Sequence, residues 1–342
     1  MKLGPFILRR IFLSLFVLFG LSILIFLLAR VVPGDPARMA LGPRAPQEVV
    51  DQYREEMHLN ESIPVQYYYW IKGIIAGDFG KSLMSRRAVI DDIKEYFPAT
   101  MELVIFAGVL MAVFAIALGS LAARYKDTLV DGLIRLGAYF GIAIPSFVLA
   151  VIFVLIFGYF WPVLPVFGRL SYNVVAPPTI TGLLTLDSIL TGNWAAFWDA
   201  IKHLILPVTA LAIAGIAQEA RITRASMVEN LHKDFLAAER GYGIPERKVI
   251  FKYLLKPSLI PTVSVMGLDL AGMIGNAFLV ELIFGWPGIS RYGIMVMLRK
   301  DLNAISAVVI LFGAVFVLMN ILVDIIVAYL DPRIRMGNVR GT

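Results

Sequence analysis

Long uncharged runs constrain this chain more than any other feature of its sequence. Residues 11–29 form an uncharged run of 19 residues, and residues 103–123 form another of 21. Each run is long enough to cross a bilayer as a helix, which requires about 20 apolar residues. Because 59% of the chain is hydrophobic and only 16% is charged, a soluble globule is excluded and an integral membrane protein is predicted.

The third uncharged run differs from the first two because it is too long for one straight span. It covers the 33 residues 136–168 and contains Pro145, Pro162 and Pro165. Prolines interrupt helices, so we expect the helix to break or end within the run after roughly 25 residues at most. The remaining spans are predicted at residues 204–224, 258–280 and 302–323, which gives six transmembrane helices in an all-α protein.

Charge distribution orients these six spans. With a cytoplasmic amino end, 17 of the 31 Lys and Arg residues lie inside and 14 outside, and nine of those 14 lie in or beside the long polar segment after the first span. Long translocated segments count little in the positive-inside rule, so both termini are predicted to be cytoplasmic. We therefore expect an N-terminal transmembrane helix (1–32), an extracytoplasmic lobe (33–100), a transmembrane domain (101–330) and a cytoplasmic tail (331–342).

Between the fourth and fifth spans, the charged segment 227–257 is predicted to fold as a helix, a tight turn and a second helix. Gly243 supplies a residue that adopts positive φ at the turn, and Pro245 suits the first position of the second helix. Pro257 disfavours an unbroken continuation of that helix. The apolar face of the first helix is expected to hold Met227, Leu231 and Phe235, with Val228 and Leu236 beside them.

Span five contains Asp269, an ionisable group near its middle. Such a group costs on the order of 3 kcal/mol at the bilayer centre, so it should face the interior of the bundle. Asn276 lies seven residues further on and shares that face, and Glu281 lies nearer the outer end. These three residues indicate either a polar translocation path or hydrogen bonds between helices. Close helix packing is expected at Gly267, Gly272 and Gly275.

No motif in the sequence indicates catalysis, nucleotide binding or metal binding. Residues 77–82, GDFGKS, have two residues between their glycines where a phosphate-binding loop needs four. His58, His203 and His232 are dispersed and lack the spacing of metal ligands, and there is no cysteine. We therefore predict no catalytic residues, no bound metal, no cofactor and no nucleic-acid partner, and expect any ATP to be hydrolysed by another subunit.

Several segments resemble the membrane subunits of binding-protein-dependent ABC importers of the dipeptide/oligopeptide/nickel permease family. The resemblance covers nearly the whole chain and is most specific in the central loop, where Asp234, Phe235, Ala238 and Gly243 match the EAA loop of that family. Glu239 stands where the family more often has alanine. The other matching segments are RRIFLSLFVLFGLSILIFLLARVVPGDPA, VQYYYWIKGIIAGDFGKSL, FPATMEL, AIPSF, WPGISR and LVDIIVAYLDPRIR.

The resemblance implies a subunit of the inner (plasma) membrane of a prokaryote. It implies a homologous second permease, two ATP-binding subunits and an extracytoplasmic solute-binding protein as partners, within the lipid bilayer. Coupling helices in the central loop would dock in a groove of the ATPase subunit, with Phe235 and Leu236 as apolar contacts. The implied substrates are di- or oligopeptides, with oligosaccharides or nickel as alternatives.

Two other classes of protein remain open from the residues alone. A secondary transporter driven by an ion gradient would use Asp269, Glu219 and Asp324 as protonation or ion sites. An intramembrane hydrolase would need a nucleophile and a base on facing helices, and the sequence offers no recognisable arrangement of this kind. The helix–glycine–helix segment favours the ABC importer, since a self-contained carrier needs no such docking surface.

Overall fold

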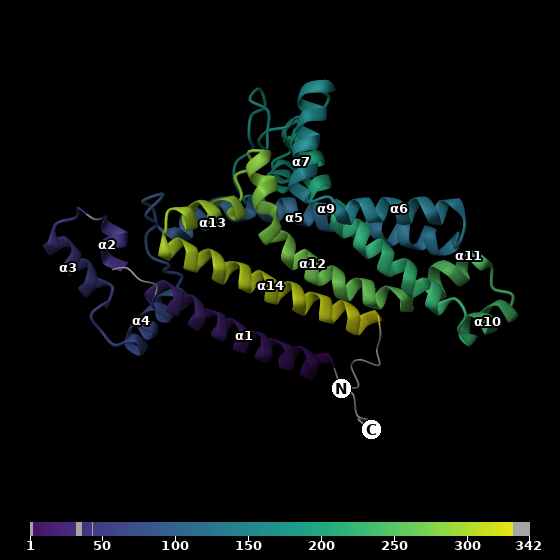
Figure 1. The fold of residues 1–342 in the computed structure, drawn as a ribbon, viewed down its shortest axis with the longest axis horizontal. Coiled ribbons are helices and arrows are strands. Elements are labelled where there is room, and N and C mark those ends of the chain that lie inside the picture. The colour runs from purple at the N-terminus through teal and green to yellow at the C-terminus, as the bar shows by residue number, and fades with distance from the viewer. Residues whose placement is uncertain (1–2, 32–35, 43, 331–342) are drawn as a thin grey trace.

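The computed structural model describes residues 3–31, 36–42 and 44–330, and within that part of the chain every regular element is a helix. Figure 1 shows the long helices running side by side, with three short helices at one end of the molecule and two at the other. The first end, which we call the lobe end, carries α2 (Pro36–Leu41), α3 (Gln47–Glu56) and α4 (Ile63–Ile75). The opposite end carries α10 (Asp234–Gly241) and α11 (Glu246–Lys248), which together with the turn between them we call the hairpin.

Five helical segments of the described chain are long and apolar enough to cross a membrane. They include all or part of the helices α1 (Leu3–Val31), α5 (Val89–Arg124), α9 (Trp194–Asn230), α12 (Leu255–Ile283) and α14 (Leu302–Leu330). Helix α9 packs against α5, α12 and the shorter α6 (Leu129–Ala143), and α1 packs against α14. The predicted tail 331–342 and the boundary at residues 32 and 33 lie outside the described residues.

The third predicted span is two short helices that meet at a sharp bend. Helix α6 (Leu129–Ala143) and the segment formed by α7 (Ser146–Leu155) and the π-helical η1 (Ile156–Phe160) are inclined at 98°. Pro145 precedes α7 and Ile144 has extended backbone angles, as expected because a proline disfavours helical geometry in the residue before it. The sequence predicts this break, and both helical segments stay within the expected limit of roughly 25 residues. Six spans are counted only when the bent pair is one span.

The fourth and fifth spans are longer than predicted. Helix α9 begins at Trp194 and continues through Pro207 to Asn230, so Met227 belongs to this span and not to the first loop helix. The expected interruption at Pro257 is also wrong, because α11, the π-helical η2 (Val249–Leu254) and α12 follow one another without a gap. Prolines are tolerated within membrane spans because neighbouring helices and local π-helical turns satisfy the backbone groups that a proline leaves without a hydrogen bond.

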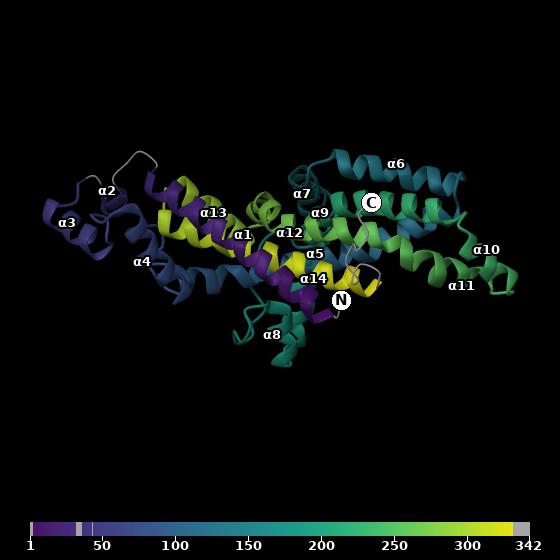
Figure 2. The ribbon, with the colours of Figure 1, turned by 90° about the horizontal axis from the view of Figure 1, so that it is seen from below.

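Helix α5 begins at Val89, inside the segment expected to belong to the lobe, and contains Pro98. In the lobe itself, α4 packs against α1: the Tyr67 hydroxyl lies 2.8 Å from Ser22 Oγ, and the Trp70 ring lies 5.4 Å from that of Phe26. The view in Figure 2 shows α8 (Leu184–Leu190) on the flank opposite α6. Helix α13 (Ile289–Leu298) lies between α12 and α14 in the chain and contacts both.

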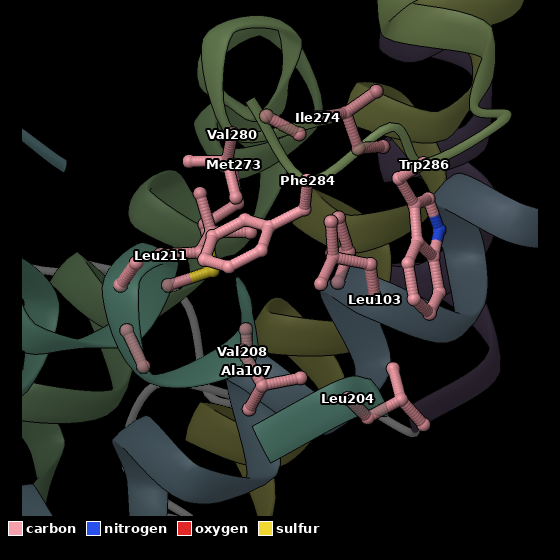
Figure 3. Packing of buried hydrophobic residues seen from close by; sticks show 14 of the residues in the cluster. Leu103, Ala107, Leu204, Val208, Leu211, Met273, Ile274, Val280, Phe284 and Trp286 are labelled. Atoms are coloured by element: carbon pink, nitrogen blue, oxygen red, sulfur yellow. The ribbon is translucent and has the colours of Figure 1, made fainter. Parts of the chain in front are cut away.

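The main apolar core joins α5, α7, α9, α12 and α14 to the turn that follows α12 (Figure 3). Helix α5 contributes Leu103, α9 contributes Leu211, and the turn contributes Phe284 and Trp286. The close helix approach predicted at Gly267 is confirmed, because a Cβ there would lie 2.2 Å from a methyl carbon of Val323 on α14. Gly272 and Gly275 have no such neighbour, so the prediction is wrong for them.

Candidate functional site

A hollow of about 580 Å³ lies between the α6–α7 bend, α9 and α12. Asp269 and Asn276 both line it, as their shared face on α12 predicts. Gln218 of α9 also lines the hollow, and its side-chain amide donates a hydrogen bond of 3.2 Å to Asp269 Oδ2. Pro145 and Ser146 also line the hollow, so the α6–α7 bend forms part of its wall. The structure therefore brings two of the three predicted polar residues of span five to one cavity.

Glu281, the third predicted path residue, lies outside this hollow. Its side chain is fully buried and accepts hydrogen bonds from the Thr100 hydroxyl of α5 and from the backbone N–H of Arg291, the latter at 2.7 Å. A Cβ at Gly288 would lie 2.1 Å from a Glu281 carboxylate oxygen, so the turn requires glycine there. Trp286 completes the junction by donating to the Ala99 carbonyl at 2.8 Å. Glu281 thus fastens the turn after α12 to α5.

At the hairpin end, the predicted turn is found at Gly243. This residue has a φ of +71°, the left-handed region that side chains resist, which confirms the conformation expected from the sequence. The Arg240 guanidinium donates two hydrogen bonds, of 2.9 and 3.1 Å, to the Glu246 carboxylate and so links α10 to α11. This hydrogen bonding raises the pKa of Arg240. Both side chains are exposed, so the pair contributes at most about 1 kcal/mol.

The two adjacent apolar residues of α10 face different surroundings. Leu236 is fully buried among Ala123 of α5, Met227 of α9 and Val249 of η2. Phe235 is 41% exposed. The prediction that both residues contact another subunit is therefore wrong for Leu236, whose side chain is already covered by its own chain. Of the other residues predicted for this contact, Asp234, Ala238 and Gly243 are exposed and Glu239 is partly buried.

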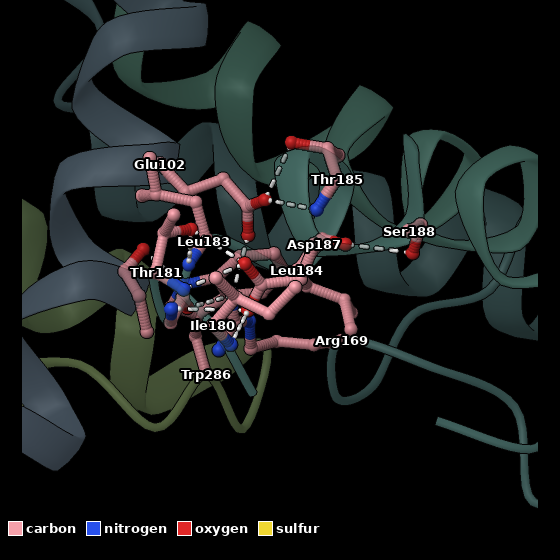
Figure 4. Close-up of polar contacts among 12 residues, drawn as sticks. Glu102, Arg169, Ile180, Thr181, Leu183, Leu184, Thr185, Asp187, Ser188 and Trp286 are labelled. Atoms are coloured by element: carbon pink, nitrogen blue, oxygen red, sulfur yellow. Dashed lines mark hydrogen bonds and ion pairs between the residues drawn. The ribbon is translucent and has the colours of Figure 1, made fainter. Parts of the chain in front are cut away.

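The loop between η1 and α9 is tied to α5 by a polar cluster (Figure 4). The buried Glu102 carboxylate accepts 2.7 Å hydrogen bonds from both the backbone N–H and the hydroxyl of Thr185. It also forms an ion pair with the Arg169 guanidinium at 2.6 Å. The Arg169 guanidinium lies 5.6 Å from the centre of the Trp286 ring. Sequence reasoning missed this cluster, although a glutamate directly preceding an apolar run is a signal for a buried partner.

Asp187 orders the same loop from within. Burial opposes its ionisation, but hydrogen bonds from the Thr181 hydroxyl and from the backbone N–H groups of Thr181, Ile180 and Gly182 outweigh burial and lower the pKa of its carboxyl. The loop therefore has a fixed shape, because one side chain satisfies three successive backbone donors.

Comparison with known proteins agrees with this architecture. Residues 115–336 match the family described as the inner membrane component of binding-protein-dependent transport systems, and residues 3–104 match the N-terminal model of the same membrane component. The chain belongs to this family and is the permease subunit of an ABC importer. Permeases of this kind work together with ATPase subunits and a binding protein. The chain is a transport subunit and not an enzyme, and this membership decides against the secondary carrier and the hydrolase.

Its named relatives are peptide and glutathione permeases. It is 34% identical over 319 residues to a probable D,D-dipeptide transport system permease protein of Escherichia coli, covering 93% of this chain and 94% of that protein. It is 36% identical over 327 residues to a dipeptide transport system permease protein of Alkalihalophilus pseudofirmus, covering 96% and 98%. A glutathione transport system permease protein of Escherichia coli is 32% identical over 330 residues, with the same coverage.

Proposed function

We propose that this permease forms one half of an import path for di- or oligopeptides. It pairs with a homologous second permease and two ATP-binding subunits, and a solute-binding protein delivers the substrate at the lobe end. Both termini and the hairpin lie on the cytoplasmic side of a prokaryotic inner membrane. The descriptions of the relatives support peptides over the oligosaccharides and nickel that the sequence leaves open.

The hairpin is the observation that supports ATP coupling most strongly. It lies at the end of the bundle opposite the lobe (Figure 1), and it exposes two aromatic residues, Phe235 within α10 and Tyr242 at the end of that helix. An exposed aromatic residue on a short helix suits a helix-in-groove contact. Leu236 anchors the same helix to the ends of α5 and α9, so a push on α10 is transmitted directly to two spans.

The hollow supports the translocation role. Asp269, Asn276 and Gln218 give it a polar wall within the membrane-spanning bundle, and intramembrane polar groups that face a cavity mark substrate or ion pathways. The α6–α7 bend forms part of the same wall, so a change in the angle between these helices would alter the size of the hollow. Motion of α9, which contacts α6 and α7, would connect the hairpin to the hollow.

The test is a Phe235→Asp variant in the complete complex. A carboxylate would replace the aromatic contact, and losing such an anchor costs about 2 kcal/mol or more of binding, so the ATPase should dissociate on purification and uptake should fall. The control is Phe235→Leu, which keeps an apolar side chain and should retain the ATPase. Full ATPase retention and wild-type peptide uptake in Phe235→Asp would remove this residue from the coupling contact.

A further inference from the structure

Glu219 is a buried acid that the functions described so far leave without a role. Its side chain is fully buried in α9, and neither carboxylate oxygen receives a hydrogen bond from the described residues. Thr223 donates to the backbone carbonyl of Glu219 at 2.8 Å and not to its carboxylate. An isolated buried carboxylate is costly, so this group requires either a proton or a positive charge nearby.

A second carboxyl group, that of Asp269 on α12, lies at the interface between the two helices. Gln218, the residue before Glu219, donates a 3.2 Å hydrogen bond to Asp269 Oδ2, so both acids lie at the same contact between α9 and α12. Two carboxyl groups at one largely buried contact do not both ionise without a compensating positive charge. The side-chain amide of Gln218 supplies one hydrogen bond to Asp269 but no charge.

The hollow offers acceptors but no cation of its own. The described residues that line it include Gln218, Asp269 and Asn276 but no Lys, Arg or His. Gln218 uses its NH₂ group on Asp269, which leaves its carbonyl oxygen as an acceptor. A primary ammonium group carries one positive charge and donates three hydrogen bonds, so it matches this set of acceptors. A divalent metal ion would need more ligands, and no cluster of three metal-ligating side chains occurs in the described part of the chain.

We propose that Asp269, with Glu219 behind it and Gln218 beside it, binds the ammonium group of the substrate as it crosses the membrane. This proposal rests on the proposed peptide path, since the amino terminus of a peptide is a primary ammonium. Asp269 touches the ammonium directly from the wall of the hollow. Glu219 keeps the proton that the pair shares, so Asp269 stays ionised, and its single negative charge pairs with the single positive charge of the ammonium.

The absence of cysteine from the chain allows a direct test of binding. An Asn276→Cys substitution places one thiol on the wall of the hollow, and its reaction with the neutral reagent methyl methanethiosulfonate reports whether the hollow is occupied. The probe is n-butylammonium, with n-butanol as the uncharged control of equal length. In the purified complex, n-butylammonium should slow the reaction about fivefold at a concentration about four times its dissociation constant, and n-butanol should not.

Asp269→Asn added to this background should abolish the protection while leaving the unprotected labelling rate similar. Glu219→Gln should weaken the protection, since it removes the second acid and keeps the shape. The matched control is Asp324→Asn, which alters a carboxylate of α14 that pairs with Arg10 at 3.0 Å, away from the hollow, and should leave protection intact. Equal protection by n-butanol, or protection that survives Asp269→Asn, would overturn the ammonium site.

A measurement of peptide uptake by the same complex shows whether the ammonium site or the proposed peptide path is at fault. If uptake of dipeptides occurs but n-butylammonium gives no selective protection, the path is correct and the ammonium site is wrong. If protection occurs but no peptide is taken up, the site binds a cation and the proposed peptide path is wrong. In the latter case the proposal that a peptide amino terminus occupies the site falls as well.

Discussion

The hairpin end and the loop between η1 and α9 are both fastened to α5, but by different interactions. At the hairpin end, Leu236 inserts among apolar side chains, and the ion pair between Arg240 and Glu246 is exposed. At the loop, Glu102 of α5 and Asp187 of α8 are buried and accept a set of directional hydrogen bonds from loop residues. The same helix therefore carries a nonpolar attachment at one end and a polar one toward the other.

The difference concerns what each attachment tolerates. Apolar contacts are non-directional, so α10 is able to tilt slightly against α5 and α9 without losing them. The hydrogen bonds of Glu102 weaken steeply once their angles change. Under the proposed function, the hairpin would move as a small lever while the loop keeps its shape, because the ATPase would act at the hairpin end.

The largest expected effect is on the polar attachment. Glu102→Leu would leave the largely buried Arg169 without its carboxylate and Thr185 without an acceptor, and breaking a buried pair in this way costs about 3–5 kcal/mol. This loss of stability is measured as the change in the free energy of unfolding of the purified protein in detergent. Glu48→Leu, at an exposed position of α3, is the control and should change stability by about 0.5 kcal/mol or less. Similar losses in the two variants would show that the cluster is not an attachment.

The apolar attachment should be weaker but still costly to remove. Leu236→Ala would leave a cavity among Met227 and Val249 and should lower the free energy of unfolding by about 3 kcal/mol. Phe235→Ala, one residue earlier and half exposed, should cost much less in the isolated permease. If both substitutions were equally destabilising, the two faces of α10 would not differ as the structure indicates.

The contribution of Asp187 to the stability of the polar attachment should depend on pH. Asp187→Asn removes charge-assisted hydrogen bonds worth about 2 kcal/mol in total. Because the folded pKa of Asp187 lies below its ordinary value, its contribution is fully present above the ordinary carboxyl pKa and is lost as the pH falls through the lower folded pKa. Unfolding measured at neutral and at acidic pH should therefore show a gap between wild type and variant that closes on acidification. A gap that widens toward low pH would contradict the lowered pKa.

The smallest expected effect on stability lies in the turn of the hairpin. Gly243→Val would force a β-branched residue into positive φ and should cost about 1–2 kcal/mol. Gly241→Val is the matched control, because Gly241 lacks positive φ and both positions are free of steric neighbours. ATP-driven uptake should fall further in Gly243→Val than in the control, since a redirected α11 would misplace the docking surface. Equal uptake in the two variants would separate the turn conformation from coupling.

Local residues are sufficient for several of these features. Long uncharged runs predict membrane helices because the bilayer demands about 20 apolar residues per span. Pro145 predicts the break in the third run, and Gly243 predicts the turn, because each acts through its own backbone. The seven-residue separation of Asp269 and Asn276 predicts their common wall, since helix geometry alone places them there.

Only the tertiary structure decided which groups meet across helices. Sequence periodicity placed Leu236 with Phe235, but the ends of α5, α9 and η2 cover one and leave the other exposed. Glu281 looked equivalent to Asp269, yet Thr100 and Arg291 bind it at the turn after α12. The placement of Glu219 and Asp269 at one contact likewise depends on how α9 packs against α12. Spacing along one chain segment fixes the direction of a side chain, whereas its partner is fixed by a second segment whose position depends on the packing of the whole bundle.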